Sequence, residues 1–290
     1  MAEQQRGDGP GASPELRGPV VLAAFEGWND AGEAASGTLA HLGEVWDAEP
    51  VVALDPEPYH DFQVNRPVVS LDDDGRRRIT WPTTRISRCR PPGSDRDVIL
   101  VRGIEPSMRW MTYTDEVLGH LQRLGATTLV TLGALLADVP HTRPIPVSST
   151  TDDAGLLERL ALEQSRYEGP TGIVGVLQEA ASRRGLPALS LWAAVPHYVG
   201  QAPSPKAVLA LLGRIEELLE VAVPLREVGE EAQAWERGVD ELAGEDAEIA
   251  DYVRHLEEAK DTADLPEATG EAIAREFERY LRRRGEGPKP

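Results

Sequence analysis

The residues best suited to carry chemistry lie in one loop of the sequence, between positions 133 and 144. Asp138, His141 and Arg143 stand within six residues of one another there. An imidazole can take up and return a proton near neutral pH, a carboxylate can orient it, and a guanidinium can hold an anion. We therefore predict that His141 is a catalytic acid and base, that Asp138 orients it, and that Arg143 binds an anionic small molecule. The alternative is a salt-bridged loop that anchors a subunit contact.

Two glycine-containing turns could present main-chain N–H groups to the same ligand. The first turn covers residues 26–32 and the second covers residues 166–172. Glycine lets a ligand approach the backbone closely, and the first residues of a helix favour an anion. The ligand-binding residues that we predict are Glu26, Gly27, Trp28, Asn29, Asp30, Arg102, Arg143, Glu168, Gly169, Thr171 and His197. The alternative for each turn is a simple helix cap.

The sequence lacks the motifs that identify common enzymes. It contains no Walker loop, no dinucleotide-binding glycine motif, no serine hydrolase elbow and no zinc protease motif. The six histidines have no spacing typical of metal ligands, so we predict no metal site, and no cofactor can be named. Cys89 is the only cysteine, which excludes an internal disulfide.

Short apolar runs alternate with amphipathic segments over the first 221 residues. The apolar runs predict buried strands, and apolar residues at helical spacing predict helices. Strands are predicted at 19–25, 98–101, 127–132 and 186–195, and helices at 33–46, 107–124, 172–184 and 205–221. This alternation is typical of a largely parallel sheet flanked by helices, an α/β fold in which ligands bind beyond the carboxyl ends of the strands. The predicted site residues lie close to such strand ends.

Two regions depart from the alternation. Residues 61–90 have the pattern of a polar β-hairpin insertion, with strands at 76–80 and 83–88 on either side of Trp81 and Pro82. Apolar residues recur at helical spacing in three C-terminal stretches, at 230–243, 245–260 and 268–285. The predicted organisation is a disordered N-terminal tail at 1–18, an α/β core at 19–222, a C-terminal helical lid at 223–285 and a flexible tail at 286–290.

The chain is acidic, which bears on its partners. Its 290 residues include 49 acidic and 30 basic side chains, for a net charge of -19. We therefore expect no general binding to nucleic acid or to an anionic membrane. The excess of acidic over basic side chains is concentrated in residues 214–290, which hold 22 acidic and 11 basic side chains. No apolar run approaches the roughly 20 residues of a membrane span, and a single cysteine fits a reducing cytoplasm.

Five motifs of the sequence form a recognisable set. They are FEGWNDAG at 25–32, DFQVNRP at 61–67, TLGALLADVPHTRP at 131–144, YEGPTGI at 167–173 and SLWAAVPHY at 190–198. Together they resemble the proteasome assembly chaperone 2 family in its actinobacterial form. The resemblance extends over about residues 18–285.

The resemblance implies a three-layer α/β/α sandwich similar to the phosphorylase/hydrolase-like fold. It also implies a homotrimer, a hairpin insertion involved in oligomer contacts, and C-terminal helices that lie over a ligand cleft. Proteasome subunits are the partners that the family's name suggests.

Two functions follow as hypotheses. The first is a non-catalytic assembly protein that acts through protein–protein contacts. The alternative is a small-molecule enzyme or binder of the hydrolase, phosphorylase or carboxylate-amine ligase type, with its cleft at the strand ends. The small-molecule alternative would be favoured if five side chains met in one pocket. They are those of Asn29, Asp138, His141, Glu168 and His197.

Overall fold

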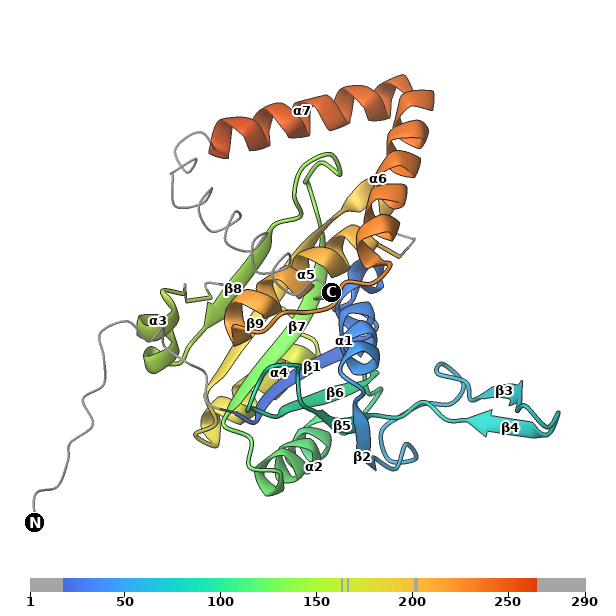
Figure 1. Cartoon of the computed structure of the whole chain (residues 1–290), viewed down its shortest axis with the longest axis vertical. Coiled ribbons are helices and arrows are strands. Elements are labelled where there is room, and N and C mark those ends of the chain that lie inside the picture. The colour runs from blue at the N-terminus through green and yellow to red at the C-terminus, as the bar shows by residue number, and fades with distance from the viewer. Residues whose placement is uncertain (1–17, 163, 166, 201–202, 265–290) are drawn as a thin grey trace, which may run out of the picture.

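The computed structural model of the chain describes residues 18–162, 164–165, 167–200 and 203–264. The N-terminal tail predicted at 1–18 lies outside the described residues except for Gly18. The helix predicted at 268–285 and the tail predicted at 286–290 lie outside them as well. In the described part, a hairpin projects from one side of an α/β core and two long helices extend from its top (Figure 1).

A seven-stranded sheet forms the centre of the core, in the order β2-β5-β6-β1-β7-β9-β8. Its strands are β1 (Val20–Glu26), β2 (Glu49–Ala53), β5 (Arg85–Cys89), β6 (Val98–Ile104), β7 (Thr128–Ala137), β8 (Val147–Thr151) and β9 (Ala188–Pro196). The central strands β6, β1, β7 and β9 are parallel, whereas β5, β2 and β8 are antiparallel to their neighbours. The predicted mixed or mostly parallel sheet is confirmed.

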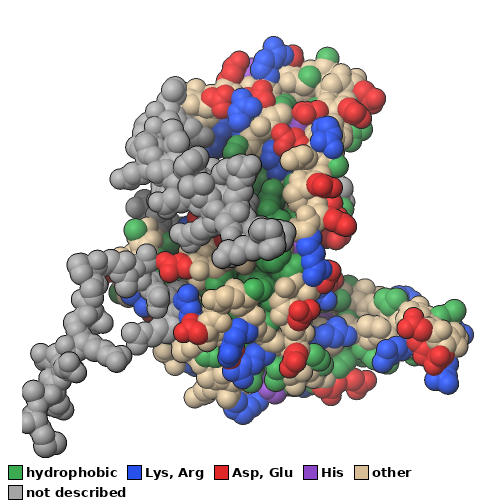
Figure 2. Space-filling view, viewed as in Figure 1, with side chains coloured by type: hydrophobic (Ala, Val, Ile, Leu, Met, Phe, Trp, Pro, Cys, Tyr) green, Lys and Arg blue, Asp and Glu red, His purple; other side chains and the backbone are tan. Residues whose placement is uncertain are grey.

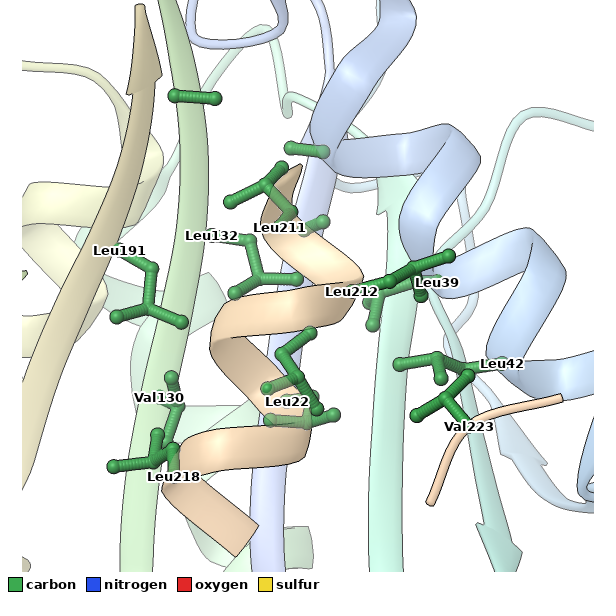
Figure 3. Packing of buried hydrophobic residues seen from close by; sticks show 14 of the residues in the cluster. Leu22, Leu39, Leu42, Val130, Leu132, Leu191, Leu211, Leu212, Leu218 and Val223 are labelled. Atoms are coloured by element: carbon green, nitrogen blue, oxygen red, sulfur yellow. The ribbon is translucent and has the colours of Figure 1, made fainter. Parts of the chain in front are cut away.

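Helices cover both faces of this sheet. On one face lie α1 (Ala34–Val45) and α5 (Pro205–Leu219), and on the other lie α2 (Trp110–Arg123) and α4 (Ile173–Arg183). A short helix, α3 (Ala154–Leu160), follows β8. Figure 3 shows leucines of α1 and α5 packed against leucines and a valine of β1, β7 and β9. The predicted three-layer α/β/α sandwich is thus confirmed.

Strand β1 shows why the continuous apolar runs form the centre of the sheet. Every residue from Val20 to Phe25 is buried. Side chains alternate across a strand, so helices on both faces are needed to bury them all. One face receives Val20, Leu22 and Ala24, and the other receives Val21, Ala23 and Phe25.

Strand β7 continues beyond the predicted end at residue 132. Residues 133–137 were expected in the loop, but they pair with β9 from Gly133 opposite Trp192 to Ala137 opposite Pro196. A Cβ atom on Gly133 would lie 2.5 Å from the Trp192 ring, so this glycine makes room for the tryptophan of the next strand. The loop with the predicted acid and base therefore begins at Asp138.

The hairpin insertion is formed by β3 (Val68–Leu71) and β4 (Arg77–Thr80), which pair with each other. The predicted pairing of residues 76–80 with 83–88 is wrong. Residues after Pro82 form β5, which joins the main sheet between β2 and β6 because Ile86 and Cys89 are buried in the core.

Two long helices follow the core, α6 (Val228–Glu245) and α7 (Ala247–Asp264). Helix α6 packs on α5, and α7 leaves the end of α6 at a sharp angle (Figure 1). The residues of α6 that are buried are Val228, Ala232, Val239 and Ala243. Within the described ranges, the helices are all too short or too polar to cross a bilayer.

Candidate functional site

The carboxyl ends of the four parallel strands bring the predicted site residues to one edge of the sheet. Residues after β1, β6, β7 and β9 lie there, together with the turn that precedes α4. They do not form one site, because they divide into two groups with different partners. We call these the cap group, around Glu105, and the lid contact cluster, around His141.

Glu105 is the centre of the cap group. Its Oε1 accepts a hydrogen bond from Asn29 Nδ2 at 3.1 Å and another from the main-chain nitrogen of Ile173 at 2.8 Å. Asn29 is 4% exposed, and Gly172 packs against it so closely that a Cβ atom there would lie 1.9 Å from Asn29 Nδ2. The first turn of α4, which we predicted to bind an anion, is therefore capped by a carboxylate of the chain itself.

Asp30 caps the helix that follows β1. Its Oδ1 accepts hydrogen bonds from the main-chain nitrogens of Ala35 at 2.8 Å and Ser36 at 3.1 Å. Burial raises the pKa of Asp30, and the hydrogen bonds from Ser36 and Ala35 oppose that rise. Burial also raises the pKa of Glu26, and the charge of Arg102 opposes it. For Asp30, the alternative of a simple helix cap therefore describes what the side chain does.

His141 is the centre of the lid contact cluster and is 1% exposed. Its Nδ1 lies 2.8 Å from Tyr198 Oη, and its Nε2 lies 2.9 Å from Asp240 Oδ1 on α6. Lys206 at the start of α5 donates to the main-chain oxygen of His141 and forms a 2.6 Å ion pair with Glu236 of α6. Both ring nitrogens of the predicted acid and base are thus engaged with other side chains.

The same loop also binds α7. Arg143 donates through Nε and Nη2 to the two carboxylate oxygens of Asp261, at 2.8 Å each, and through Nη1 to Glu257 at 3.1 Å. The bonds with Asp261 raise the pKa of Arg143 and lower the pKa of Asp261. This predicted anion ligand is paired with carboxylates of α7.

Asp138 contacts α7 rather than His141. Its Oδ1 accepts a hydrogen bond from Tyr252 Oη at 3.0 Å and lies 3.3 Å from His197 Nδ1. The rings of His197 and Tyr252 meet edge to face at 5.5 Å, and Tyr198 meets Tyr252 in the same way at 6.2 Å. Burial raises the pKa of Tyr198 to about 12, so this phenol stays neutral at physiological pH. Asp240, not Asp138, is the carboxylate that orients His141.

The remaining predicted residues are exposed, in turns or, for Arg102, on β6. Trp28 is 66% exposed, and Tyr167, beside Glu168 and Gly169, is 67% exposed with its Oη donating to the oxygen of Pro170 at 2.8 Å. The main-chain oxygen of Asn29 accepts from the nitrogen of Ala134 at 2.8 Å, which places Trp28 beside the end of β7. Thr171 and Arg102 are exposed as well.

Large apolar side chains are exposed at this edge of the sheet, and we call them the edge patch. Its members are Trp28, Leu135, Leu136 and Tyr167; Leu135 and Leu136 are consecutive residues of β7, so their side chains point to opposite faces of the sheet. Exposed aromatic and large aliphatic side chains are common on surfaces that bind other proteins. Sequence reasoning picked Trp28 as a ligand contact but missed the leucines, because it placed them in a loop instead of at the end of β7.

Comparison with known proteins gives consistent results. The family model described as PAC2 family matches residues 24–243. The chain is 59% identical to a PAC2 family protein from Streptomyces avermitilis, with a TM-score of 0.77 and coverage of 81% of this chain and 100% of that one. It is 55% identical to a proteasome-assembly chaperone homologue from Mycobacterium tuberculosis, with a TM-score of 0.73 and coverage of 81% and 99%.

More distant similarity concerns the fold alone. An archaeal proteasome activator from Pyrococcus furiosus has 17% identity and a TM-score of 0.61, with coverage of 79% of this chain and 95% of that one. A search of curated proteins gave no match.

Proposed function

Because the chain belongs to the PAC2 family, we propose that it is a proteasome-assembly-chaperone-like protein that acts through protein–protein contacts. The observation that carries this proposal is the edge patch, in which Trp28 and Tyr167 are 66% and 67% exposed in turns at this edge of the sheet. Tryptophan and tyrosine are the residues that most often dominate the energy of protein interfaces. We propose proteasome subunits as the partners and the cytoplasm as the location. The M. tuberculosis relative and the single cysteine support these assignments.

An enzyme is the less favoured function, because the polar residues that would do the chemistry already have structural partners. Both nitrogens of His141 are occupied, Arg143 is paired with Asp261, and Glu105 fills the first turn of α4. A general acid and base must reach its substrate. A ring whose two nitrogens are both bonded to other side chains is poorly placed for that role.

An anionic small molecule is the second partner that we propose, at Arg102. This guanidinium is exposed at the carboxyl end of β6, and its charge acts on Glu26. It has no part in the lid contact cluster. A thermal-shift screen with phosphate and small carboxylates, run on the wild-type chain and on Arg102→Ala, tests this partner.

Replacing Trp28 and Leu135 with serine should weaken binding to proteasome subunits by about tenfold or more, because interface aromatics carry much of the binding energy. The measurement is chemical crosslinking and co-purification from the native host, quantified by mass spectrometry. Leu242→Ser is the control, since Leu242 is 63% exposed on α6 and is not a member of the edge patch. Equal loss in both variants, or no proteasome subunit recovered with the wild-type chain, would contradict the proposal.

We also propose that the chain forms a homotrimer through the hairpin. Val69 pairs with Ile79 and Leu71 with Arg77, so Val69, Leu71 and Ile79 lie on one face of this two-stranded sheet, and all three are at least half exposed. The hairpin projects away from the core and carries hydrophobic side chains along its length (Figures 1 and 2). A two-stranded sheet needs packing against another surface to be stable, and a second copy can supply it.

Leu71→Glu combined with Ile79→Glu should convert the oligomer to monomers, because the two carboxylates would be buried without partners in the interface. Sedimentation velocity or light scattering measures the mass. Ser70→Glu combined with Thr80→Glu adds the same charge to the other face of the hairpin and should keep the wild-type mass. A wild-type chain that is monomeric at micromolar concentration would exclude the trimer.

A further inference from the structure

A groove on the helical face of the core has no role in the function proposed above. It has a volume of about 470 Å³ and is lined by residues along the length of α1 and at the starts of α5 and α6. Its volume falls within the range of about 300–1,000 Å³ that is typical of ligand sites. The small or aliphatic residues in its lining are Gly32, Gly37, Ala40, Pro203, Pro205, Val208 and Val228.

The rim of the groove is acidic. Glu33, Glu227 and Glu231 are exposed there, and in the part of the chain that the structure describes no ion pair joins them to a cation. The one arginine of the lining, Arg226, is already paired with Glu44. The rim therefore carries carboxylates without a compensating charge.

Ser204 supplies a second and independent feature. It lines the groove, it is 1% exposed, and its hydroxyl has no hydrogen-bond partner among the described residues. Buried hydroxyl groups in native proteins normally have a partner. Although Ser204 begins α5, its side chain does not cap that helix, so the hydroxyl is left for another group.

The backbone holds Glu33 at the rim in an unusual conformation. Gly32 and Glu33 both have left-handed backbones, with φ of 60° and 51°, and the nitrogen of Ser204 donates to the oxygen of Gly32 at 2.8 Å. Glutamate rarely adopts this conformation, which costs free energy that the surrounding structure must offset. Glu33 and Ser204 are thereby fixed beside each other.

We propose that this groove binds a basic, extended segment of a partner protein. Lysine or arginine side chains of the segment pair with Glu33, Glu227 and Glu231, and a main-chain group of the segment bonds to the Ser204 hydroxyl. Charge complementarity selects this occupant, since an anionic or acidic ligand would be repelled by the rim. The site is separate from both the edge patch and the hairpin.

The test uses the full chain and a fluorescent octapeptide of alternating arginine and alanine, with fluorescence anisotropy as the readout. We expect saturable binding that Glu33→Gln combined with Glu231→Gln weakens by about tenfold at low salt, and by less at high salt because the charges are screened. Glu241→Gln combined with Glu245→Gln changes the net charge equally on a later part of α6, and it should leave binding unchanged. Ser204→Ala should weaken binding by about threefold.

Three results would overturn the proposal. The first is no binding of the arginine peptide, and the second is the same loss in the Glu241 and Glu245 control pair, which would mean attraction by net charge alone. The third is binding that appears only after Arg282, Arg283 and Arg284 are replaced by alanine. That result would assign the groove to the chain's own C-terminal basic residues instead of a partner.

Discussion

Replacing Glu105 with alanine should lower the free energy of unfolding by about 3 kcal/mol. The Glu105 carboxylate accepts hydrogen bonds from the nearly buried Asn29 amide and from the first turn of α4. Its loss leaves two donors without an acceptor, each at a cost of about 1–3 kcal/mol. At about 2 °C per kcal/mol for a chain of this size, the melting temperature should fall by about 6 °C.

Glu105→Gln separates the hydrogen bonds from the charge. The glutamine side chain has the same shape and keeps a carbonyl oxygen that can accept from both donors, so we expect a loss of about 1 kcal/mol. Urea denaturation followed by far-ultraviolet circular dichroism measures both variants. An alanine variant as stable as the wild type, or a glutamine variant as unstable as the alanine variant, would show that these bonds do not hold the cap group together.

The sequence predicted the central strands and their helices because burial on both faces leaves a strong apolar signal. The edge strands leave a weaker one. Residues of β2 are mostly exposed and those of β8 are mostly half-buried, and their sequences, EPVVA and VSSTT, have no continuous apolar run. The hairpin was placed in the right region but with the wrong partner strands, because β4 and β5 are both short and arginine-rich.

The candidate site could be located from the sequence, but its contacts could not. Residues after the strands lie at the carboxyl edge, as the α/β pattern predicts. The partners of Asn29, His141 and Asp138, in contrast, lie 76, 99 and 114 residues further along the chain. Such long-range pairs cannot be predicted from local spacing. Because Asp138 is close to His141 in the sequence, we predicted that it orients the His141 ring, but in the structure Asp240 makes that contact.

Because the carboxylate partner of His141 is Asp240 of α6, we predict that His141 attaches the C-terminal helices to the core. If it fastens the lid, His141→Ala should loosen α6 and α7 while the sheet stays intact, because the buried ring bonds to Tyr198 and to Asp240 of α6. Removing a buried, fully bonded side chain costs about 2 kcal/mol or more in local stability. Amide hydrogens of the two lid helices should then exchange about 30-fold faster.

Hydrogen exchange read by mass spectrometry measures this effect helix by helix, with β1 and β7 as internal references. His255→Ala is the matched control, since His255 is exposed on α7 and its Nδ1 lies 2.8 Å from the main-chain oxygen of Asp251 in the same helix. Combining His141→Ala with Asp240→Ala should cost less than the sum of the two single losses, whereas combining it with Asp138→Ala should be additive. If the stability losses of His141→Ala and Asp240→Ala add, while those of His141→Ala and Asp138→Ala do not, the pair of Asp138 and His141 that the sequence suggested is restored. If the exchange rates of α6 and α7 are the same in His141→Ala as in the wild type, His141 does not attach these helices to the core.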